Sequence, residues 1–471
     1  FLAVTNHGGA QEFTLSWVGL GHHAADQWLP AMDGPLPGDP GWGEGDAGEG
    51  EGEGDAGAGD GAGAGDGDAA GNGAGAGDGG GRLQSALARR LIGIDAFAGH
   101  VVVSLREEGQ TVLYLVPVTG RGLEWSDAGA LRPSPGSFLE VATNEQFDAP
   151  FVTVVSQSRI DPPVWSDHLL VPGSEPVVRH RAQAPNHDSG SYVVTQKWIT
   201  ARDGQRIPVT LASHRVTPLD GTAPCLLYGY GSYEYCVEPL FSRTLPSLLD
   251  RGVVWAHAHV RGGGELGRRW WDDGHLATKA NSFRDFVDVA RSLGGGPDAV
   301  VDGSRLVSRG GSAGGLLVAA GMDLDPEAFA GVIAEVPFVD VVNSMLDSEL
   351  PLTVGEWEEW GNPGLPEQFA WLADYSPYDN VPPAGRRPFI LATGAVHDPR
   401  VMVHEPAKWV ARLRASDPQH GAVEVPGRRG GVLLRVALEE GSHGGAAGRY
   451  AALDEEAQTQ SLILAAMGID G

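Results

Sequence analysis

The stretch SRGGSAGGLLVAAGM, residues 308–322, sets a single serine between two pairs of glycines and runs directly into an apolar, alanine-rich segment. Residues 310–314 match the G-x-S-x-G pattern, with Ser312 at its centre. The residues before it are typical of a strand end and those after it of a helix, which is the context of a nucleophile elbow. Small residues are needed there because strand and helix approach closely, and the helix N-terminus offers unpaired N–H groups. A flexible glycine turn is the alternative that the motif alone leaves open.

Beyond residue 190, strand-like and helix-like segments alternate, and this predicts a doubly wound, mostly parallel sheet. The first two strand-like segments, 192–200 and 207–215, are predicted to pair antiparallel through the turn between them. The segment 281–295 predicts an amphipathic helix with Asn281 as its N-cap. The apolar stripe expected on this helix consists of Phe283, Phe286, Val287, Ala290 and Leu293.

Residues 1–190 have a different pattern, because short β-branched or alternating runs such as 100–107 and 111–120 are separated by turn residues. Such runs predict the hairpins of an all-β domain, and they fit the blades of a propeller as well as a sandwich. Residues 43–81 interrupt this domain with glycine, alanine and acidic residues, so we expect that segment to be disordered. A calcium-binding β-roll is a less favoured alternative, because the segment lacks the apolar residue that each repeat needs.

Composition excludes several classes of function. The formal net charge of −28 argues against nucleic acid as a partner, because phosphate binding requires a basic face. No apolar run approaches the length of about 18 residues that a transmembrane helix needs, so no membrane association is expected. Two cysteines, Cys225 and Cys236, in a chain of this length favour a cytoplasmic protein with reduced thiols.

The start of the chain has no recognisable signal peptide. Phe1 opens a strand-like run, which we interpret as the sign of an N-terminally incomplete chain. The sequence specifies no oligomeric state.

Two further residues follow late strands in the order that a serine nucleophile of this fold requires, which is Ser, then Asp or Glu, then His. Asp398 follows the strand-like run 389–394, and His443 lies in a glycine-rich loop after the run 432–440. We therefore expect His443 to accept the proton of Ser312. Asp398 is expected to orient the imidazole and to stabilise its charged form.

No metal-binding or phosphate-binding motif is recognisable, and no cofactor is expected. The glycine-rich run 261–267 resembles a nucleotide loop, but it follows a strand without opening the helix that such a loop needs. His257 and His259 lie in an apolar strand and are interpreted as structural, as is His397 beside Asp398.

Several segments are distinctive as longer strings. They are LLYGYGSYE (226–234), HVRGGGELGRRWWDDG (259–274), GGSAGGLL (310–317), GEWEEWGNP (355–363), ATGAVHDPRV (392–401) and GSHGG (441–445). Together they resemble the oligopeptidase B branch of the prolyl oligopeptidase family of serine peptidases, densely from about residue 190 onward and more weakly before it. The resemblance implies an α/β-hydrolase domain joined to a β-propeller that restricts substrates to short peptides. The expected domains are a partial propeller over 1–190 and a peptidase domain over 191–471.

Residue by residue, the resemblance assigns roles in catalysis. It implies that Ser312 is the nucleophile and that Asp398 and His443 complete the triad. The oxyanion hole would consist of the hydroxyl of Tyr230 and the backbone N–H of Ala313.

The resemblance also implies a substrate site for short peptides with Arg or Lys before the cleaved bond. Glu356 and Glu358, in a segment expected to be extended, would point both carboxylates at one cation. Glu238 would receive a second basic residue, and Arg400 would bind a carbonyl of the substrate backbone. The family often has a further acid where this chain has Leu240, and that departure weakens the case for a preference for paired basic residues.

Three functions remain from the sequence. The first is a serine oligopeptidase that cuts short peptides after Arg or Lys. The second is a carboxylesterase, which would require an apolar pocket for the acyl group, and the acids Glu356 and Glu358 argue against such a pocket. The third is an inactive, truncated chain whose β-rich part only binds, since an incomplete propeller exposes strand edges.

Overall fold

The computed structural model describes most of the chain after residue 88. The described residues are 2–5, 14–17, 29–30 and 89–469, except 121, 172, 297–298, 386, 419–430, 440 and 446–447. The acidic, glycine-rich segment 43–81, which we expect to be disordered, lies outside the described residues. Near the start of the chain three short strands pair antiparallel in the order β1 (Leu2–Thr5), β2 (Thr14–Trp17) and β3 (Leu29–Pro30).

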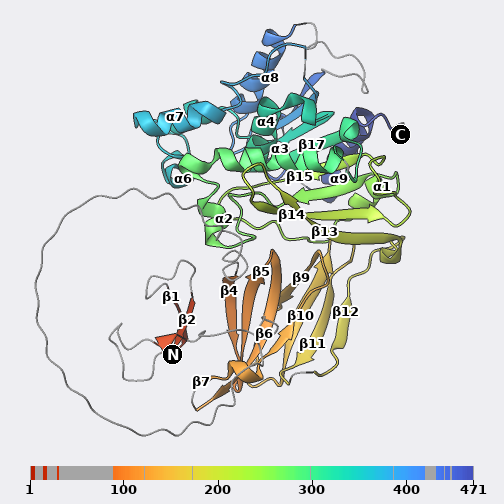
Figure 1. The fold of residues 1–471 in the computed structure, drawn as a ribbon, viewed down its shortest axis with the longest axis vertical. Coiled ribbons are helices and arrows are strands. Elements are labelled where there is room, and N and C mark those ends of the chain that lie inside the picture. Colours follow the sequence, from red (N-terminus) through yellow and green to blue (C-terminus); the bar gives the residue numbers. More distant parts are fainter. Residues whose placement is uncertain are drawn as a thin grey trace, which may run out of the picture.

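Residues 89–181 form two antiparallel sheets of consecutive hairpins (Figure 1). The first contains β4 (Arg89–Ala96), β5 (His100–Glu107), β6 (Gln110–Thr119) and β8 (Gly129–Leu131), with β7 (Gly122–Leu123) paired to the end of β6. The second contains β9 (Ser137–Val141), β10 (Phe151–Ser158), β11 (Val164–Leu169) and β12 (Val177–Arg181), in sequence order across the sheet. Such meanders, one after another along the chain, are typical of propeller blades.

The two sheets pack face to face through side chains that alternate along each strand. Val102, Leu113 and Leu115 of the first sheet share one buried cluster with Val152 and Val154 of the second. The intervening residues of β5 and β6 belong to a separate cluster on the opposite face. This period of two is what the sequence predicts for strands, and each buried side chain of this size contributes about 1.5–3 kcal/mol.

The described residues from 192 onward are built around one eight-stranded sheet (Figure 1). In order across the sheet, its strands are β13 (Tyr192–Thr200), β14 (Arg206–His214), β16 (Val254–Ala258), β15 (Cys225–Tyr228), β17 (Leu306–Gly311), β18 (Gly331–Glu335), β19 (Phe389–Ala395) and β20 (Val432–Ala437). β14 pairs antiparallel with β13 and with β16, and the other neighbours are parallel. The predicted antiparallel pair and mostly parallel sheet are confirmed.

Helices cover both faces of this sheet. Their bounds are α1 (Leu245–Leu249), α2 (Arg268–Asp272), α3 (Ala280–Gly294), α4 (Ala313–Leu324), α5 (Val341–Leu346), α6 (Thr353–Trp360), α7 (Pro366–Tyr375), α8 (His404–Ser416) and α9 (Arg449–Ala466). α3, α4 and α8 contribute to one large buried cluster, and α1 and α9 contribute to a second. Figure 1 shows these two groups on opposite faces, which is the doubly wound arrangement.

The predicted amphipathic helix is α3, and its apolar stripe is buried as expected. Its predicted cap is wrong. The N-cap position is Lys279, while Asn281 lies inside the first turn. The side-chain amide of Asn281 instead donates a hydrogen bond of 3.0 Å to the carbonyl oxygen of Asp273, a tertiary contact that a local pattern does not predict.

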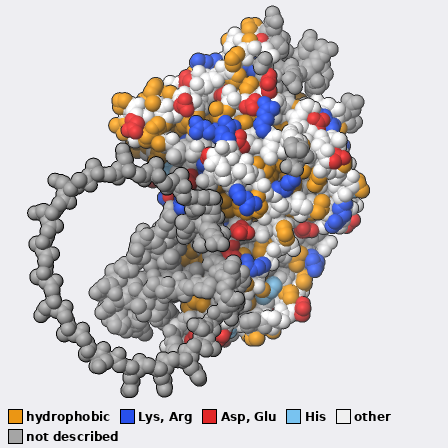
Figure 2. Space-filling view, in the orientation of Figure 1, with side chains coloured by type: hydrophobic (Ala, Val, Ile, Leu, Met, Phe, Trp, Pro, Cys, Tyr) orange, Lys and Arg blue, Asp and Glu red, His pale blue; other side chains and the backbone are white. Residues whose placement is uncertain are grey.

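In the part of the chain that the structure describes, no helix is both long and apolar enough to cross a membrane. On the face shown in Figure 2, apolar side chains gather around α7, where Leu365 and Phe369 are exposed, and charged side chains of both signs are interspersed elsewhere. Cys225 is buried and Cys236 is half-buried, and neither takes part in a disulfide.

Candidate active site

Ser312 lies in the tight turn between β17 and α4. Its backbone has a φ of 57° and a ψ of −118°, a conformation that costs a non-glycine residue about 1–3 kcal/mol. The flanking glycines are needed for steric reasons. A Cβ on Gly310 would lie 2.1 Å from the carbonyl oxygen of Gly314, and a Cβ on Gly314 would lie 2.7 Å from that of Gly229. The strand–turn–helix context predicted from the motif is therefore present.

Hydrogen bonds on both sides of Ser312 fix this turn. The N–H of Ser312 donates to the carbonyl oxygen of Glu335 at 2.8 Å, and the N–H of Phe338 donates to the carbonyl oxygen of Ser312 at 3.2 Å. Ala313 is buried and is the first residue of α4, so its N–H has no acceptor within the helix. An N–H in this position can stabilise negative charge on a nearby oxygen.

Asp398 follows β19 and His443 follows β20, and the structure brings their side chains together. Nδ1 of His443 lies 2.9 Å from Oδ2 and 3.1 Å from Oδ1 of Asp398. Oδ1 also accepts the backbone N–H groups of Arg400 at 2.8 Å and Val401 at 3.0 Å. Asp398 is only 3% exposed, so these donors compensate for burying its charge. With Nδ1 directed to the acid, Nε2 is the ring atom left to exchange a proton.

One cavity of about 330 Å³ has both Ser312 and His443 in its wall. An ion-pair network supports the strand that ends at Ser312. Arg309 of β17 lies 2.9 Å from a carboxylate oxygen of Glu335 in β18 and 2.7 Å from one of Glu456 in α9. The network ties the strand before the elbow to its neighbour and to the last helix.

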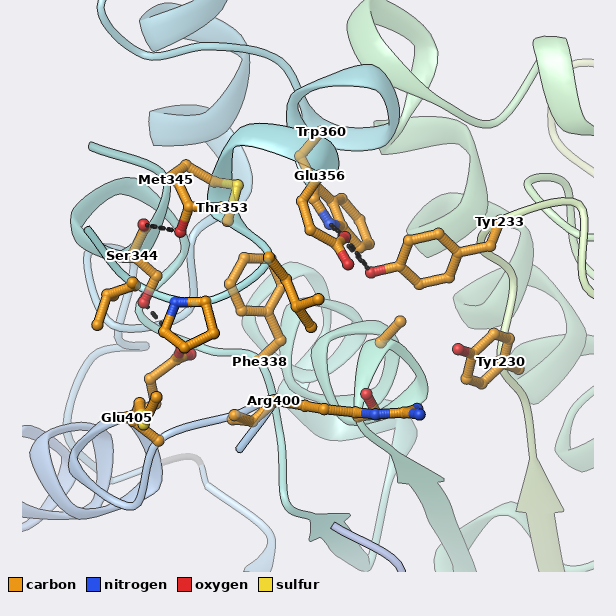
Figure 3. A pocket seen from close by; sticks show the side chains of 17 residues that line it. Tyr230, Tyr233, Phe338, Ser344, Met345, Thr353, Glu356, Trp360, Arg400 and Glu405 are labelled. Atoms are coloured by element: carbon orange, nitrogen blue, oxygen red, sulfur yellow. Dashed lines mark hydrogen bonds between the residues drawn. The ribbon is translucent and has the colours of Figure 1, made fainter. Parts of the chain in front are cut away.

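A second cavity, of about 360 Å³, also includes Ser312 in its wall (Figure 3). We call it the Glu356 cavity, because Glu356 lines it together with Tyr230, Ala313 and Arg400. In Figure 3 the guanidinium of Arg400 extends toward Tyr230, across the cavity from Glu356. Most of the side chains that the sequence assigns to the site are therefore near one another.

Tyr230 follows β15 and presents a protonated hydroxyl. Burial raises the pKa of this hydroxyl above its ordinary value, and the neighbouring Tyr228 and Glu356 raise it further. The group therefore remains an O–H donor at neutral pH. Its ring packs edge-on against the ring of Tyr235, with the ring centroids 5.4 Å apart, which limits its rotation.

Glu356 and Glu358 lie in a helix, which corrects the predicted extended segment. Both belong to α6. Because residues two positions apart in a helix differ by about 200° around its axis, the two side chains point to nearly opposite sides. Oε2 of Glu356 accepts hydrogen bonds from the hydroxyl of Tyr233 at 2.5 Å and from Nε1 of Trp360 at 2.8 Å. Glu358 is exposed and does not line the Glu356 cavity. The two carboxylates therefore do not converge on one cation.

Glu359, which sequence reasoning missed, is the buried acid of this helix. Its Oε1 accepts the backbone N–H of Tyr233 at 2.9 Å, and its Oε2 accepts the indole N–H of Trp271 at 2.8 Å. Glu359 thereby fixes the segment that carries Tyr233. If the segment had been predicted as a helix, its periodicity would have placed Glu356 and Glu359 on one face and Glu358 on another.

Glu405, at the start of α8, is a second acid that the sequence analysis missed. It lines the Glu356 cavity and is buried. Its carboxylate accepts the hydroxyl of Ser344 at 2.8 Å and the N–H groups of Val339 at 2.9 Å and Asp340 at 3.1 Å. Burial raises the pKa of Glu405 to about 7, against the opposing effect of these donors. Glutamate is common in the first turn of a helix, where it interacts favourably with the helix dipole. The sequence position of Glu405 therefore did not indicate that it lines a cavity.

Glu238 does not line the Glu356 cavity. It forms an ion pair with Arg106 of β5, which is 5% exposed. The pair joins the first antiparallel sheet to the loop after β15. A second pair, between Arg90 of β4 and Glu234 at 2.9 Å, makes the same connection. Glu238 is therefore already matched with a cation of the protein itself, away from Ser312.

Residues 239–469 match the sequence profile of the prolyl oligopeptidase family. These residues belong to the prolyl oligopeptidase family. The chain is similar to dipeptidyl aminopeptidase BI of Pseudoxanthomonas mexicana, with 44% identity over 286 residues, 60% of this chain and 38% of that protein. Protease 2 of Moraxella lacunata is 34% identical over 375 residues, 79% of this chain and 51% of that protein.

Solved structures of oligopeptidase B are similar to most of this chain. Oligopeptidase B from Trypanosoma brucei, with covalently bound antipain in a closed form, has a TM-score of 0.73 and 35% identity, and the match covers 82% of this chain and 53% of that one. Oligopeptidase B from Leishmania major has a TM-score of 0.71 and 31% identity, over 81% of this chain and 52% of that one. The fold is an α/β hydrolase with a partial β-propeller-like domain. The chain spans about half the length of these proteins.

Proposed function

We propose that this chain is a serine peptidase that hydrolyses short peptides through Ser312, His443 and Asp398. The observation that carries the proposal is the contact of 2.9 Å between Nδ1 of His443 and Asp398, beside a cavity shared with the strained Ser312. Oγ of Ser312 attacks the scissile carbonyl carbon while Nε2 of His443 takes its proton and later gives it to the leaving amine. Asp398 keeps Nδ1 protonated and stabilises the imidazolium. Water, activated by His443, then hydrolyses the acyl-enzyme.

The oxyanion hole consists, in this proposal, of the N–H of Ala313 and the hydroxyl of Tyr230. The first lies at the N-terminus of α4, directly after the nucleophile. The second is a protonated donor in the wall of a cavity that includes Ser312. Both are set before the substrate binds, so they stabilise the developing charge without reorganisation.

The proposed specificity is for Arg or Lys before the cleaved bond. Glu356 supplies the carboxylate, held in place by Tyr233 and Trp360, and a guanidinium or ammonium group would pair with it. Arg400 lies in the same cavity, where it can donate to a carbonyl oxygen of the substrate backbone. Glu358 is left out of this pocket because it is exposed.

We also propose a domain boundary near residue 190, with the partial propeller in 1–190 and the peptidase domain in 191–471. The second antiparallel sheet ends with β12 at Arg181, and the eight-stranded sheet begins with β13 at Tyr192. The unpaired thiols of Cys225 and Cys236 fit the reducing environment of the cytoplasm, where we propose that the protein acts.

Removal of dipeptides from a free amino terminus is a second candidate. It is favoured by the 44% identity to a protein named dipeptidyl aminopeptidase BI. The two activities differ in one requirement, because an aminopeptidase must recognise the positive charge of the amino terminus. Peptides that end in Arg-aminocoumarin, with either a free or an acetylated amino terminus, therefore distinguish them. Equal rates favour the oligopeptidase, and loss of cleavage on acetylation favours the aminopeptidase.

The peptidase proposal is tested with a serine-directed fluorophosphonate probe and a pair of substrates. We expect the folded chain to react with the probe and to hydrolyse Arg amides faster than acyl esters of similar size. Hydrolysis of esters without any hydrolysis of Arg amides would instead indicate a carboxylesterase. A folded chain that does not react with the probe would be a binding protein only.

A further inference from the structure

A group of three side chains lies apart from the proposed triad. His257 is in β16, His259 directly follows that strand, and Glu265 lies in the glycine-rich loop after it. One nitrogen of each histidine and one oxygen of Glu265 all lie within 4.8 Å of one another. They line a small cavity together with Arg106 and Thr210, and none of the triad residues lines it.

The backbone positions these side chains on one side. Residues two apart in a strand point to the same face, and the rings of His257 and His259 have their centroids 4.0 Å apart and their planes tilted by 47°. Gly263 makes room for the acid, because a Cβ there would lie 2.2 Å from Oε2 of Glu265. The strand and the glycine loop thus direct two imidazoles and one carboxylate into the same space.

Two buried polar atoms of this group, one on His259 and one on Glu265, lack hydrogen-bond partners among the described residues. Nε2 of His259 is engaged with the hydroxyl of Thr210 at 2.9 Å. Nδ1 of His259 lies 3.5 Å from Oε1 of Glu265, and neither Nδ1 nor Oε2 of Glu265 has a hydrogen-bond partner among the described residues. Glu265 is 5% exposed and His257 is 4% exposed. Buried polar atoms without partners are costly, and a cation bound between them would compensate for this cost.

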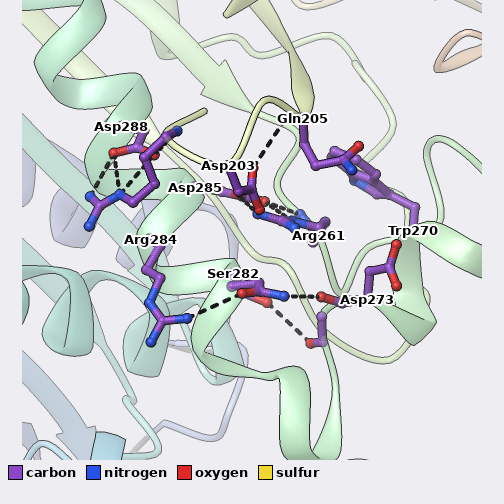
Figure 4. Close-up of polar contacts among 12 residues, drawn as sticks. Asp203, Gln205, Arg261, Trp270, Asp273, Ser282, Arg284, Asp285 and Asp288 are labelled. Carbon is purple, nitrogen blue, oxygen red and sulfur yellow. Dashed lines mark hydrogen bonds and ion pairs between the residues drawn. The ribbon is translucent and has the colours of Figure 1, made fainter. Parts of the chain in front are cut away.

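Hydrogen bonds and ion pairs hold the start of the adjoining glycine loop around Arg261 (Figure 4). Arg261, at the start of the glycine loop, donates through Nε to Asp285 of α3 at 2.8 Å and lies 2.7 Å from Asp203. The indole N–H of Trp270 donates to the carbonyl oxygen of His259 at 3.1 Å. The start of the segment that carries His259 and Glu265 is therefore anchored at residues 259 and 261.

We propose that His257, His259 and Glu265 bind one divalent transition-metal ion, with Zn²⁺ as the best match. Two imidazole nitrogens and one carboxylate oxygen form a ligand set that Zn²⁺ takes, with a fourth position open to water. The contact between Thr210 and the second nitrogen of His259 orients the imidazole, as outer partners of zinc ligands do. The ligand atoms, which lie within 4.8 Å of one another, would have to approach one another by side-chain rotation to form tetrahedral bonds of about 2.0–2.1 Å.

The charge balance also favours a cation. Arg106, the cation in the cavity wall, forms its ion pair with Glu238 and also interacts electrostatically with Glu265, so two acids share this one arginine. The bound ion would join β16 to the glycine loop and act on the structure of the domain rather than on the bond that Ser312 attacks.

The test measures metal binding directly, so its result does not depend on peptidase activity. The full chain, without a histidine tag and stripped with a chelator, is titrated with Zn²⁺, and its metal content after gel filtration is measured by mass spectrometry. Co²⁺ serves as a spectroscopic substitute whose visible absorption reports tetrahedral N and O ligands. The variants are His259→Gln and Glu265→Gln, each of which removes one ligand with little change of volume. The matched controls are His404→Gln and Glu145→Gln, both at exposed positions.

We expect one equivalent of Zn²⁺ per chain, a rise of the thermal midpoint with Zn²⁺, and tetrahedral Co²⁺ bands. Each ligand variant should weaken binding by about 100-fold or more, since even outer partners of zinc ligands contribute 10–100-fold. The two control variants should bind like the wild type. The proposal is overturned by a folded wild-type chain that binds none of these ions in stoichiometric amount. It is equally overturned if both ligand variants keep the wild-type affinity. If one variant fails to fold, the wild-type stoichiometry and the other variant still decide.

Discussion

Oε2 of Glu356 accepts hydrogen bonds from both the hydroxyl of Tyr233 and the indole N–H of Trp360, at 2.5 Å and 2.8 Å. Because both donors meet the same oxygen, they hold the carboxylate in one orientation and leave its second oxygen to face a ligand. Burial and the nearby charge of Glu356 raise the pKa of Tyr233 well above its ordinary value, so that hydroxyl remains a donor at neutral pH. The acid in this cavity is thus pre-oriented, as the recognition of a basic side chain requires.

Replacing Glu356 by Gln should reduce the preference for basic substrates. Loss of a buried charged partner costs about 2–5 kcal/mol, so kcat/KM for Arg substrates should fall by roughly thirty-fold to several-thousand-fold. Substrates with an apolar residue before the cleaved bond should change little. Glu358→Gln, at an exposed position of the same helix, is the matched control and should alter neither class. Equal losses for Arg and apolar substrates in Glu356→Gln would remove this residue from the specificity pocket.

Ser312→Ala should abolish reaction with a fluorophosphonate probe and reduce kcat by roughly a million-fold, because the attacking oxygen is gone. The fold should persist, since the glycines that allow the turn are unchanged. The control is Ser461→Ala, at an exposed position of α9, which should react with the probe like the wild type. Labelling of the alanine variant at the wild-type rate, measured by gel fluorescence, would contradict the assignment.

Tyr230→Phe removes one hydroxyl with little change of volume. We expect the hydrolysis rate to fall by about a hundred- to a thousand-fold, which is the usual loss when one oxyanion donor is deleted. The thermal midpoint should stay the same. Tyr235→Phe serves as control because Tyr235 packs against the Tyr230 ring and is 57% exposed. A folded Tyr230→Phe variant with an unchanged rate would make Tyr230 a packing residue.

The fold was predictable from the sequence for those helices and strands in which burial of one face produces a regular repeat of apolar residues. α3 repeats apolar residues on one face, and β13 and β14 flank a short turn, so each pattern has one structural solution. The elbow at Ser312 was predictable for a steric reason, because the approach of β17 and α4 leaves no room for a Cβ at Gly310 or Gly314. The local pattern predicted the wrong N-cap for α3, because the side-chain amide of Asn281 forms a tertiary hydrogen bond that a local pattern does not predict.

The sequence predicted the order of Ser312, Asp398 and His443 but not the shape of the substrate site. We expected the segment of Glu356 and Glu358 to be extended, which would place both carboxylates on the same side. The segment is a helix, and in a helix this spacing places them on different sides. Glu405 comes from a helix far along the chain, and its burial depends on Ser344 and the backbone it meets there. Such contacts join elements that are distant in sequence, so no single segment carries a pattern for them.

Glu405 should make the stability of the domain depend on pH. Its pKa is raised from 4.5 to about 7 because burial disfavours the charged form. Between these two pH values the folded protein binds more protons at this site than the unfolded chain does. The contribution of Glu405 to stability is therefore fully present below about pH 4.5 and is lost as the pH rises through about 7.

Glu405→Gln isolates this effect, because the amide oxygen can still accept the N–H groups of Val339 and Asp340 but the side chain does not ionise. The measurement is the free energy of unfolding in urea for both proteins, at several pH values from about 4.5 to about 8. The variant should gain stability relative to the wild type as the pH rises through this range, and the gain should level off once the wild-type carboxyl is ionised. Glu145→Gln, at an exposed position, should show a difference from the wild type that does not change with pH. A difference for Glu405→Gln that is equally flat would mean that Glu405 titrates alike in the folded and unfolded chain, and that burial in the cavity wall does not hold its proton.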